Sequence, residues 1–179
     1  MTTVPSPLRI AAYRRYWLAH LSSVMATRGI VVILGYQLYD VARTEYAMSI
    51  QQAAFVLGLL GLVQFVPLML LTPVAGVLAD RIDRRHVAGF AIILDMTIAL
   101  VLALATSVGL HSLPLLFSLA ALHGMARVFM GPAMSAISPN IVPAEVIPRA
   151  IATSSIAFQA GSIIGPAAAG VLFAHTPAL

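Results

Sequence analysis

The sequence predicts an all-α membrane protein with five transmembrane helices. Of its 179 residues, 60% are hydrophobic and only 9% are charged, whereas a soluble domain carries about a quarter charged residues. The apolar residues form five blocks, each long enough to cross a bilayer, which takes roughly 20 helical residues. A chain with a mean hydropathy of +0.97 has too little polar surface to coat a water-soluble globule. Lipid is therefore the expected solvent.

The apolar blocks are expected to be helices rather than strands of a barrel. Hydrocarbon cannot satisfy free backbone groups, and a helix satisfies all of them within one segment. A transmembrane strand would alternate in polarity over about ten residues, and the continuous apolar runs at 92–94 and 97–105 do not alternate. The predicted spans are 17–40, 53–78, 87–108, 113–137 and 151–174.

The first span follows a short basic lead, residues 1–16. This lead could lie on the membrane as an amphipathic helix or form a disordered tail. The apolar stretch after it exceeds the core of about 7–15 residues found in signal peptides, and further spans follow, so an uncleaved first span is predicted. The aromatic residues at its two ends are expected at the membrane interfaces: Tyr13, Tyr16 and Trp17 at one, Tyr36, Tyr39 and Tyr46 at the other.

The connections between the predicted spans are short. Segment 41–52 is polar, segment 79–86 is heavily charged, and a tight turn around Ser112 joins the third and fourth spans. The fourth connection, 138–149, contains three prolines, which break helices. Residues 175–179 form the end after the fifth span.

The arginines predict which ends of the spans face the cytoplasm. All ten basic residues are arginine, and seven lie on one side of the predicted membrane: Arg9, Arg14, Arg15, Arg81, Arg84, Arg85 and Arg149. The opposite loops contain only Arg43. Because short loops rich in Lys or Arg stay in the cytoplasm, the N-terminus is expected inside and residues 175–179 outside. The Arg- and Ala-rich composition points to a multi-pass protein of the bacterial inner (plasma) membrane.

Several function classes are disfavoured. The net charge of +4 is distributed by membrane side rather than clustered on one face, so nucleic acid is not an expected partner. The chain has no cysteine, which excludes disulfide and thiol chemistry. Its five histidines show no metal-ligand spacing, and no phosphate-binding glycine loop or nucleophilic triad is visible. We therefore expect no metal, no cofactor and no enzymatic activity.

The segment between the second and third spans reads GVLADRIDRR over residues 76–85. It resembles the G-x-L-A-D-R-x-G-R-R loop signature of the major facilitator superfamily, at the same place in the topology. The match is carried by Gly76, Asp80, Arg81, Arg84 and Arg85, and Asp83 stands where the pattern has glycine. Gly76 would permit close helix approach, and the resemblance implies a conformational-switch loop whose Asp contacts a helix of the second half. A basic loop that only sets topology is the alternative.

The fifth span contains a second signature, GSIIGPAAAG at 161–170. Gly161 and Gly165 share one helix face and form a flat strip for close backbone contact, and Pro166 invites a bend. The segment resembles the G-x-x-x-G-P-x-x-x-G antiporter signature of superfamily exporters, with Gly170 as its last glycine. The resemblance implies that the strip packs against the other half of a transporter. An ordinary small-residue packing face is the alternative.

Three charged residues lie well inside the predicted spans, away from the ends: Arg28, Asp95 and Arg127. At 1.5 Å per residue they lie roughly 16, 12 and 15 Å from the cytoplasmic ends of their helices. Charges at mid-bilayer are costly and face an interior or a cavity, so a cluster is expected. It could be a structural Asp95–Arg127 pair. Alternatively, a remaining arginine such as Arg28 attracts an anionic substrate while Asp95 exchanges protons.

The fourth span supplies a further resemblance, through Arg127 and the R-x-F-x-x-P-A pattern that follows it. This pattern is similar to that of the drug and siderophore exporter branch, specifically of enterobactin-exporter-like proteins. His123, Gly131 and Ser135 recur with Arg127 every four residues and are expected to form one stripe.

Together, the signatures imply a partial N-terminal half of a major facilitator fold. The implied function is proton-coupled efflux of small organic molecules, such as drugs or siderophores, with a C-terminal half or another chain as partner. Members have two similar halves with the substrate path between them. The alternative is a truncated or subunit-type membrane protein without transport activity of its own.

Overall fold

Five long helices dominate the computed structural model, which describes residues 6–175 apart from the side chains of residues 78–81, 84, 174 and 175. The helices are α1 (Ala11–Thr44), α2 (Ile50–Arg81), α3 (Arg84–Ser107), α4 (Leu113–Ile137) and α5 (Ile147–His175). Within the described residues every regular element is helical, and all five long helices have the length and composition to cross a membrane. The predicted all-α membrane architecture with five spans is confirmed.

Most helices are longer than the spans predicted from hydropathy. Helix α1 covers 11–44 rather than 17–40, and α2 covers 50–81 rather than 53–78. Hydropathy marks the apolar centre of a helix, whereas backbone hydrogen bonds continue into its polar ends. The expected external end at 175–179 lies, apart from the backbone of His175, outside the described residues.

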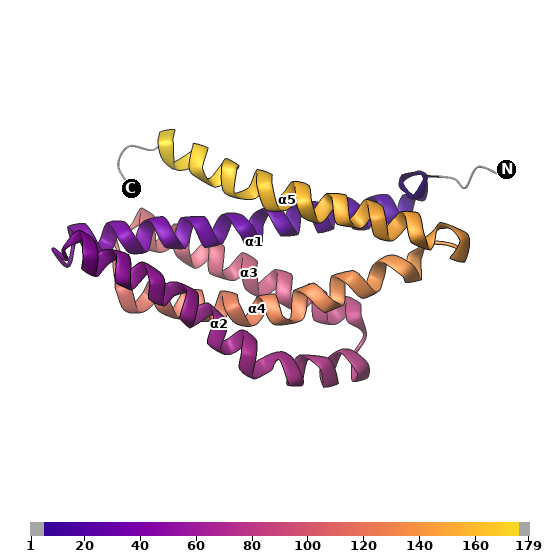
Figure 1. Ribbon diagram of the computed structural model, residues 1–179, viewed down its shortest axis with the longest axis horizontal. Coiled ribbons are helices and arrows are strands. Elements are labelled where there is room, and N and C mark those ends of the chain that lie inside the picture. Colours follow the sequence, from indigo (N-terminus) through magenta and orange to yellow (C-terminus); the bar gives the residue numbers. More distant parts are fainter. Residues whose placement is uncertain (1–5, 176–179) are drawn as a thin grey trace.

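Successive helices run in opposite directions, so the connections alternate between the two ends of the bundle (Figure 1). One end holds the start of α1, the α2–α3 connection and the α4–α5 connection. The other end holds the α1–α2 and α3–α4 connections (Figure 1). Arg9, Arg85 and Arg149 therefore share one end of the bundle, hereafter the arginine-rich end, and Arg43 lies at the other.

Helix α1 lies alongside α5, while α4 packs against both α2 and α3 (Figure 1). Two apolar clusters fill the spaces between these helices. One, around Leu34, Leu38 and Ile98, joins α1, α2, α3 and α4 toward the end that holds Arg43. The other, around Tyr13, Ala91 and Ala133, joins α1, α3, α4 and α5 toward the arginine-rich end.

The fifth-span glycines pack against α1 of this chain. A Cβ placed on Gly161 would lie 2.9 Å from the Val24 side chain, and one on Gly165 would lie 2.9 Å from the Cα of Met25. Side chains at these two positions would therefore separate α1 from α5. The implied contact of this strip with another half of the transporter is wrong for Gly161 and Gly165, because α1 occupies that face. A Cβ on Gly170 meets open space, and Pro166 lies within a continuous α5.

The basic lead is largely part of the bundle rather than a separate segment. Residues Pro7–Arg9 form a short 3-10 helix, and α1 begins at Ala11. Tyr13 is fully buried, and its hydroxyl donates to the carbonyl oxygen of Ala150 at 2.6 Å. The Tyr16 hydroxyl donates to the carbonyl oxygen of Met134 at 2.9 Å. These two tyrosines therefore face α4 and α5 within the bundle, near the arginine-rich end.

A glycine and several prolines shape the connections that follow α3 and α4. Gly109 has φ +70°, a conformation that costs glycine little, in the connection that precedes α4. After α4, two short 3-10 helices, Ser138–Ile141 and Ala144–Val146, occupy the proline-containing connection. They turn the chain so that α5 returns beside α1 (Figure 1).

Candidate functional site

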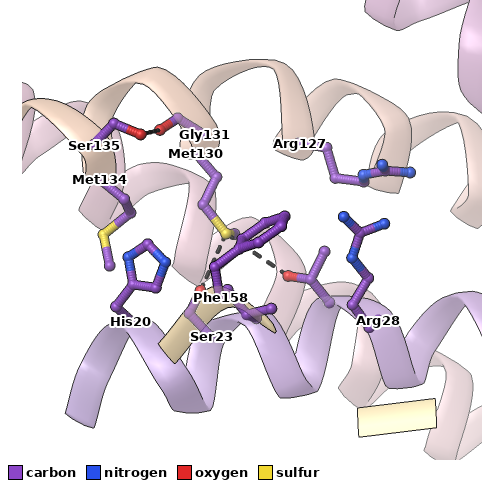
Figure 2. Close-up of a pocket in the computed structure, with 11 residues that line it drawn as sticks. His20, Ser23, Arg28, Arg127, Met130, Gly131, Met134, Ser135 and Phe158 are labelled. Carbon is purple, nitrogen blue, oxygen red and sulfur yellow. Dashed lines mark hydrogen bonds between the residues drawn. The ribbon is translucent and has the colours of Figure 1, made fainter. Parts of the chain in front are cut away.

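A cavity of about 200 Å³ lies between α1, α4 and α5. Its polar lining comes mainly from α1 and α4, and Phe158 of α5 forms part of its wall. Arg28 and Arg127 both line it, one from each of two helices (Figure 2). We call this space the arginine cavity.

The two arginines lack a carboxylate partner. Within the part of the chain that the structure describes, neither guanidinium group has an acidic oxygen within 4 Å. The guanidinium carbon of Arg28 lies 5.6 Å from the centre of the Phe158 ring, a cation–π distance. Arginine stays protonated in proteins, so the cavity contains two positive charges on partly buried side chains. Such a cavity is suited to an anionic group.

Asp95 lies beside the arginine cavity and is only 5% exposed. Its Oδ2 accepts a hydrogen bond from Thr27 Oγ1 at 2.9 Å, and its Oδ1 lies 2.9 Å from Nδ1 of His123. The structural Asp95–Arg127 pair considered from the sequence is therefore not formed. Helix rotation explains the difference, because α4 turns His123 rather than Arg127 toward α3.

His123 is fully buried, and its Nε2 has no hydrogen-bond partner. An unpartnered N–H would be more costly here than an unpartnered lone pair, so the proton is assigned to Nδ1. The Nδ1–H group of His123 then donates to the Asp95 carboxylate. Thr27 links the other carboxylate oxygen to the arginine cavity, since Thr27 also lines that cavity.

The predicted fourth-span stripe is divided between two faces. Arg127, Gly131 and Ser135 line the arginine cavity, whereas His123 points into the bundle. Each step of four residues drifts by about 40° around a helix with 3.6 residues per turn. Three such steps therefore separate His123 from Ser135 by about a third of a turn.

The loop signature is described only in part. The side chains of Asp80, Arg81 and Arg84 lie outside the described residues. Asp83 caps α3 by accepting a hydrogen bond from the Arg85 backbone N–H at 2.9 Å, a stabilising role at a helix N-terminus. A Cβ on Gly76 would meet open space, so the expected close helix approach at this glycine is absent from the described part of the structure.

Thr27 and His20 received no role from the sequence, which placed His123 only in the fourth-span stripe, without a partner. Thr27 and His123 hold Asp95, and His20 lines the arginine cavity. Their positions within apolar spans were a usable signal, because polar side chains there usually face an interior. Among the described residues, no group of three or more His, Cys, Asp or Glu side chains could hold a metal ion.

Comparison with known proteins identifies the family of this chain. A family model described as "Transmembrane secretion effector" matches residues 2–179, which is nearly the whole chain. The chain belongs to this family of the major facilitator superfamily. It is therefore grouped with transporters rather than with enzymes.

Relatives from two bacterial groups agree with this assignment. The chain is 31% identical over 131 residues to an uncharacterized MFS-type transporter of Mycobacterium bovis, a match covering 73% of this chain and 27% of the relative. It is 30% identical over 124 residues to macrolide efflux protein A of Streptococcus pyogenes, covering 68% of this chain and 30% of the relative. The chain thus spans less than a third of these transporters. No solved structure matches it.

Proposed function

We propose that this chain forms the first five helices of a proton-coupled exporter of small organic molecules, of the drug or siderophore type. The observation that carries the proposal is the arginine cavity beside a buried, hydrogen-bonded carboxylate. Arg28 and Arg127 provide a positive surface for an anionic substrate, and Asp95 provides a group that can gain and lose a proton.

The coupling follows from the charges of the site. With Asp95 ionised, the cluster contains two arginines and one carboxylate, a net charge of +1. A change in the protonation of Asp95 changes this charge by one unit, so the proton occupancy of Asp95 and the binding of a charged substrate are coupled. Thr27 joins the carboxylate to the cavity, so a change at Asp95 is felt where the substrate binds.

The exporter direction is supported by the fifth-span signature and by the efflux relative. The enterobactin-exporter-like branch is supported only by the fourth-span resemblance. Gly131, Ser135 and Phe158 are exposed at the cavity. We propose that further helices, from a C-terminal half or another chain, cover this side and complete the substrate path.

The arginine distribution supports an orientation in the bacterial inner membrane with the arginine-rich end and the N-terminus in the cytoplasm. The conformational-switch role of residues 76–85 belongs to the same proposal. Asp80 would contact a helix outside this segment.

The test is efflux driven by a pH gradient in inverted membrane vesicles that contain the full-length protein. Asp95→Asn should abolish the pH-driven component, because an amide neither gains nor loses a proton near neutral pH. Unchanged pH-driven transport by this variant would refute the role of Asp95 in coupling.

A second candidate is a subunit-type or truncated membrane protein without transport activity of its own. It is favoured by the open side of the cavity, where Gly131, Ser135 and Phe158 are exposed. Expression of residues 1–179 alone distinguishes the two candidates. Efflux by that segment would refute the second, and its co-purification with another membrane chain would support it.

A further inference from the structure

A second cavity, of about 270 Å³, adjoins the arginine cavity toward the arginine-rich end. His20, Ser135 and Phe158 line both cavities, so the two spaces share a wall. Hydroxyl groups and one amide dominate the polar lining of the second cavity, from Tyr16, Ser138, Ser154, Ser155 and Gln159. We call it the hydroxyl cavity.

The two cavities differ in chemistry. Two guanidinium groups line the arginine cavity, whereas no Asp, Glu, Lys or Arg among the described residues lines the hydroxyl cavity. Ser135 and Ser155 use their protons within their own helices, donating to the carbonyl oxygens of Gly131 at 2.9 Å and Ile151 at 3.1 Å. Their oxygens retain lone pairs. The hydroxyl cavity therefore offers acceptors to hydrogen-bond donors of a ligand.

His20 stands at the junction of the two cavities and is 9% exposed. Its Nδ1 lies 3.2 Å from the Tyr16 hydroxyl, which already donates its only proton to the carbonyl oxygen of Met134. Nδ1 must therefore be the donor in its contact with Tyr16. The other ring nitrogen, Nε2, is then an acceptor, and it is buried without a partner. This nitrogen is an unused hydrogen-bond acceptor in a side chain that lines both spaces; neighbouring side chains cover it in this structure, so a ligand must displace them to reach it.

We infer that the two cavities form one bipartite site for an organic anion that also carries hydroxyl groups. The acid group lies at Arg28 and Arg127, an apolar or aromatic middle packs on Phe158, and a ligand hydroxyl donates to Nε2 of His20. His20 and Arg28 are eight residues apart on α1, which corresponds to about 12 Å along the helix. The ligand therefore separates its acid from its hydroxyls by roughly that length. This inference rests on the proposed function only in treating the cavity as the substrate site.

Three probes test the two parts separately. The first, 4-(β-D-glucosyloxy)benzoate, has a carboxylate, an aromatic ring and sugar hydroxyls. The second, 4-(hexyloxy)benzoate, lacks the hydroxyls, and the third, phenyl β-D-glucoside, lacks the carboxylate. Calorimetric titration of the full-length protein in nanodiscs should show the first probe binding at least about tenfold more tightly than either of the others.

Two substitutions of His20 provide a matched pair. In His20→Asn the amide reaches the position of Nδ1, so the Tyr16 contact is kept and the Nε2 acceptor is lost. In His20→Gln the amide reaches the position of Nε2. The Asn variant should bind the glucosyloxy probe about tenfold more weakly, the Gln variant should largely retain its affinity, and both should bind 4-(hexyloxy)benzoate as before.

The inference is overturned if no probe binds, if the three affinities are equal, or if His20→Asn weakens both carboxylate probes equally. Probe binding does not require a pH gradient. The bipartite site and the proton-coupled exporter are therefore tested independently. A preserved tenfold preference without pH-driven efflux would refute the proposed function alone. Efflux with no preference for hydroxyls would refute only the bipartite site.

Discussion

Nδ1 of His123 lies 2.9 Å from Oδ1 of Asp95, and both side chains are buried between α3 and α4. This contact satisfies one oxygen of a carboxylate placed among apolar helices. The other oxygen is held by Thr27 on α1. Side chains from three helices, α1, α3 and α4, thus meet at one acidic group.

Removal of the His123 ring should destabilise the protein through Asp95. His123→Leu leaves Oδ1 of a buried carboxylate without a donor, and a hydrogen bond between membrane helices contributes about 1–2 kcal/mol. We expect a lower thermal midpoint in detergent. Combining it with Asp95→Leu should restore part of the loss, because no polar atom is then left unpaired. Strictly additive losses would show that the two residues do not interact.

In the absence of ligand, repulsion between Arg28 and Arg127 should lower the stability of the protein. Arg28 and Arg127 line the same cavity without a carboxylate within 4 Å of either in the described structure. Arg127→Gln should therefore raise the stability of the ligand-free protein by on the order of 1 kcal/mol, while anion binding weakens. Arg127→Lys, which keeps the charge, is the control. A lower thermal midpoint for the Gln variant, with the Lys variant unaffected, would contradict the repulsion argument.

Close packing of α1 on α5 should make Gly165 intolerant of side chains. Gly165→Leu places atoms against the Met25 backbone and should cost about 1–3 kcal/mol. The same substitution at Gly170, where a Cβ meets open space, is the matched control and should have little effect. Thermal unfolding of the purified variants measures both. Equal effects at the two positions would show that α1 does not lie on this strip in the membrane.

The absence of cysteine makes the orientation easy to test. Ile82 is 44% exposed at the arginine-rich end, and Leu110 is 56% exposed at the other. In intact cells, a membrane-impermeant maleimide should label Leu110→Cys and leave Ile82→Cys unlabelled until the cells are permeabilised. Labelling of Ile82→Cys alone in intact cells would invert the proposed topology.

Much of the architecture could be predicted without coordinates. Long apolar blocks establish the number of spans, because the cost of exposing backbone groups to hydrocarbon applies to each segment separately. The same reasoning located Arg28, Asp95 and Arg127 within the spans and expected them to cluster. The structure places all three around the arginine cavity, with Asp95 just behind Thr27.

Partner choice, by contrast, depended on helix rotation and on which helices are neighbours. A rotation that directs His123 to Asp95 also directs Arg127 into the cavity, and no property of α4 alone specifies that angle. Similarly, Gly161 and Gly165 indicated a close helix contact, but only the return of α5 beside α1 shows which helix supplies it. The sequence by itself determined the membrane character, the spans and the buried charges, since these follow from local hydrophobicity. Tertiary structure decided which side chains meet, because that depends on packing between segments far apart in the chain.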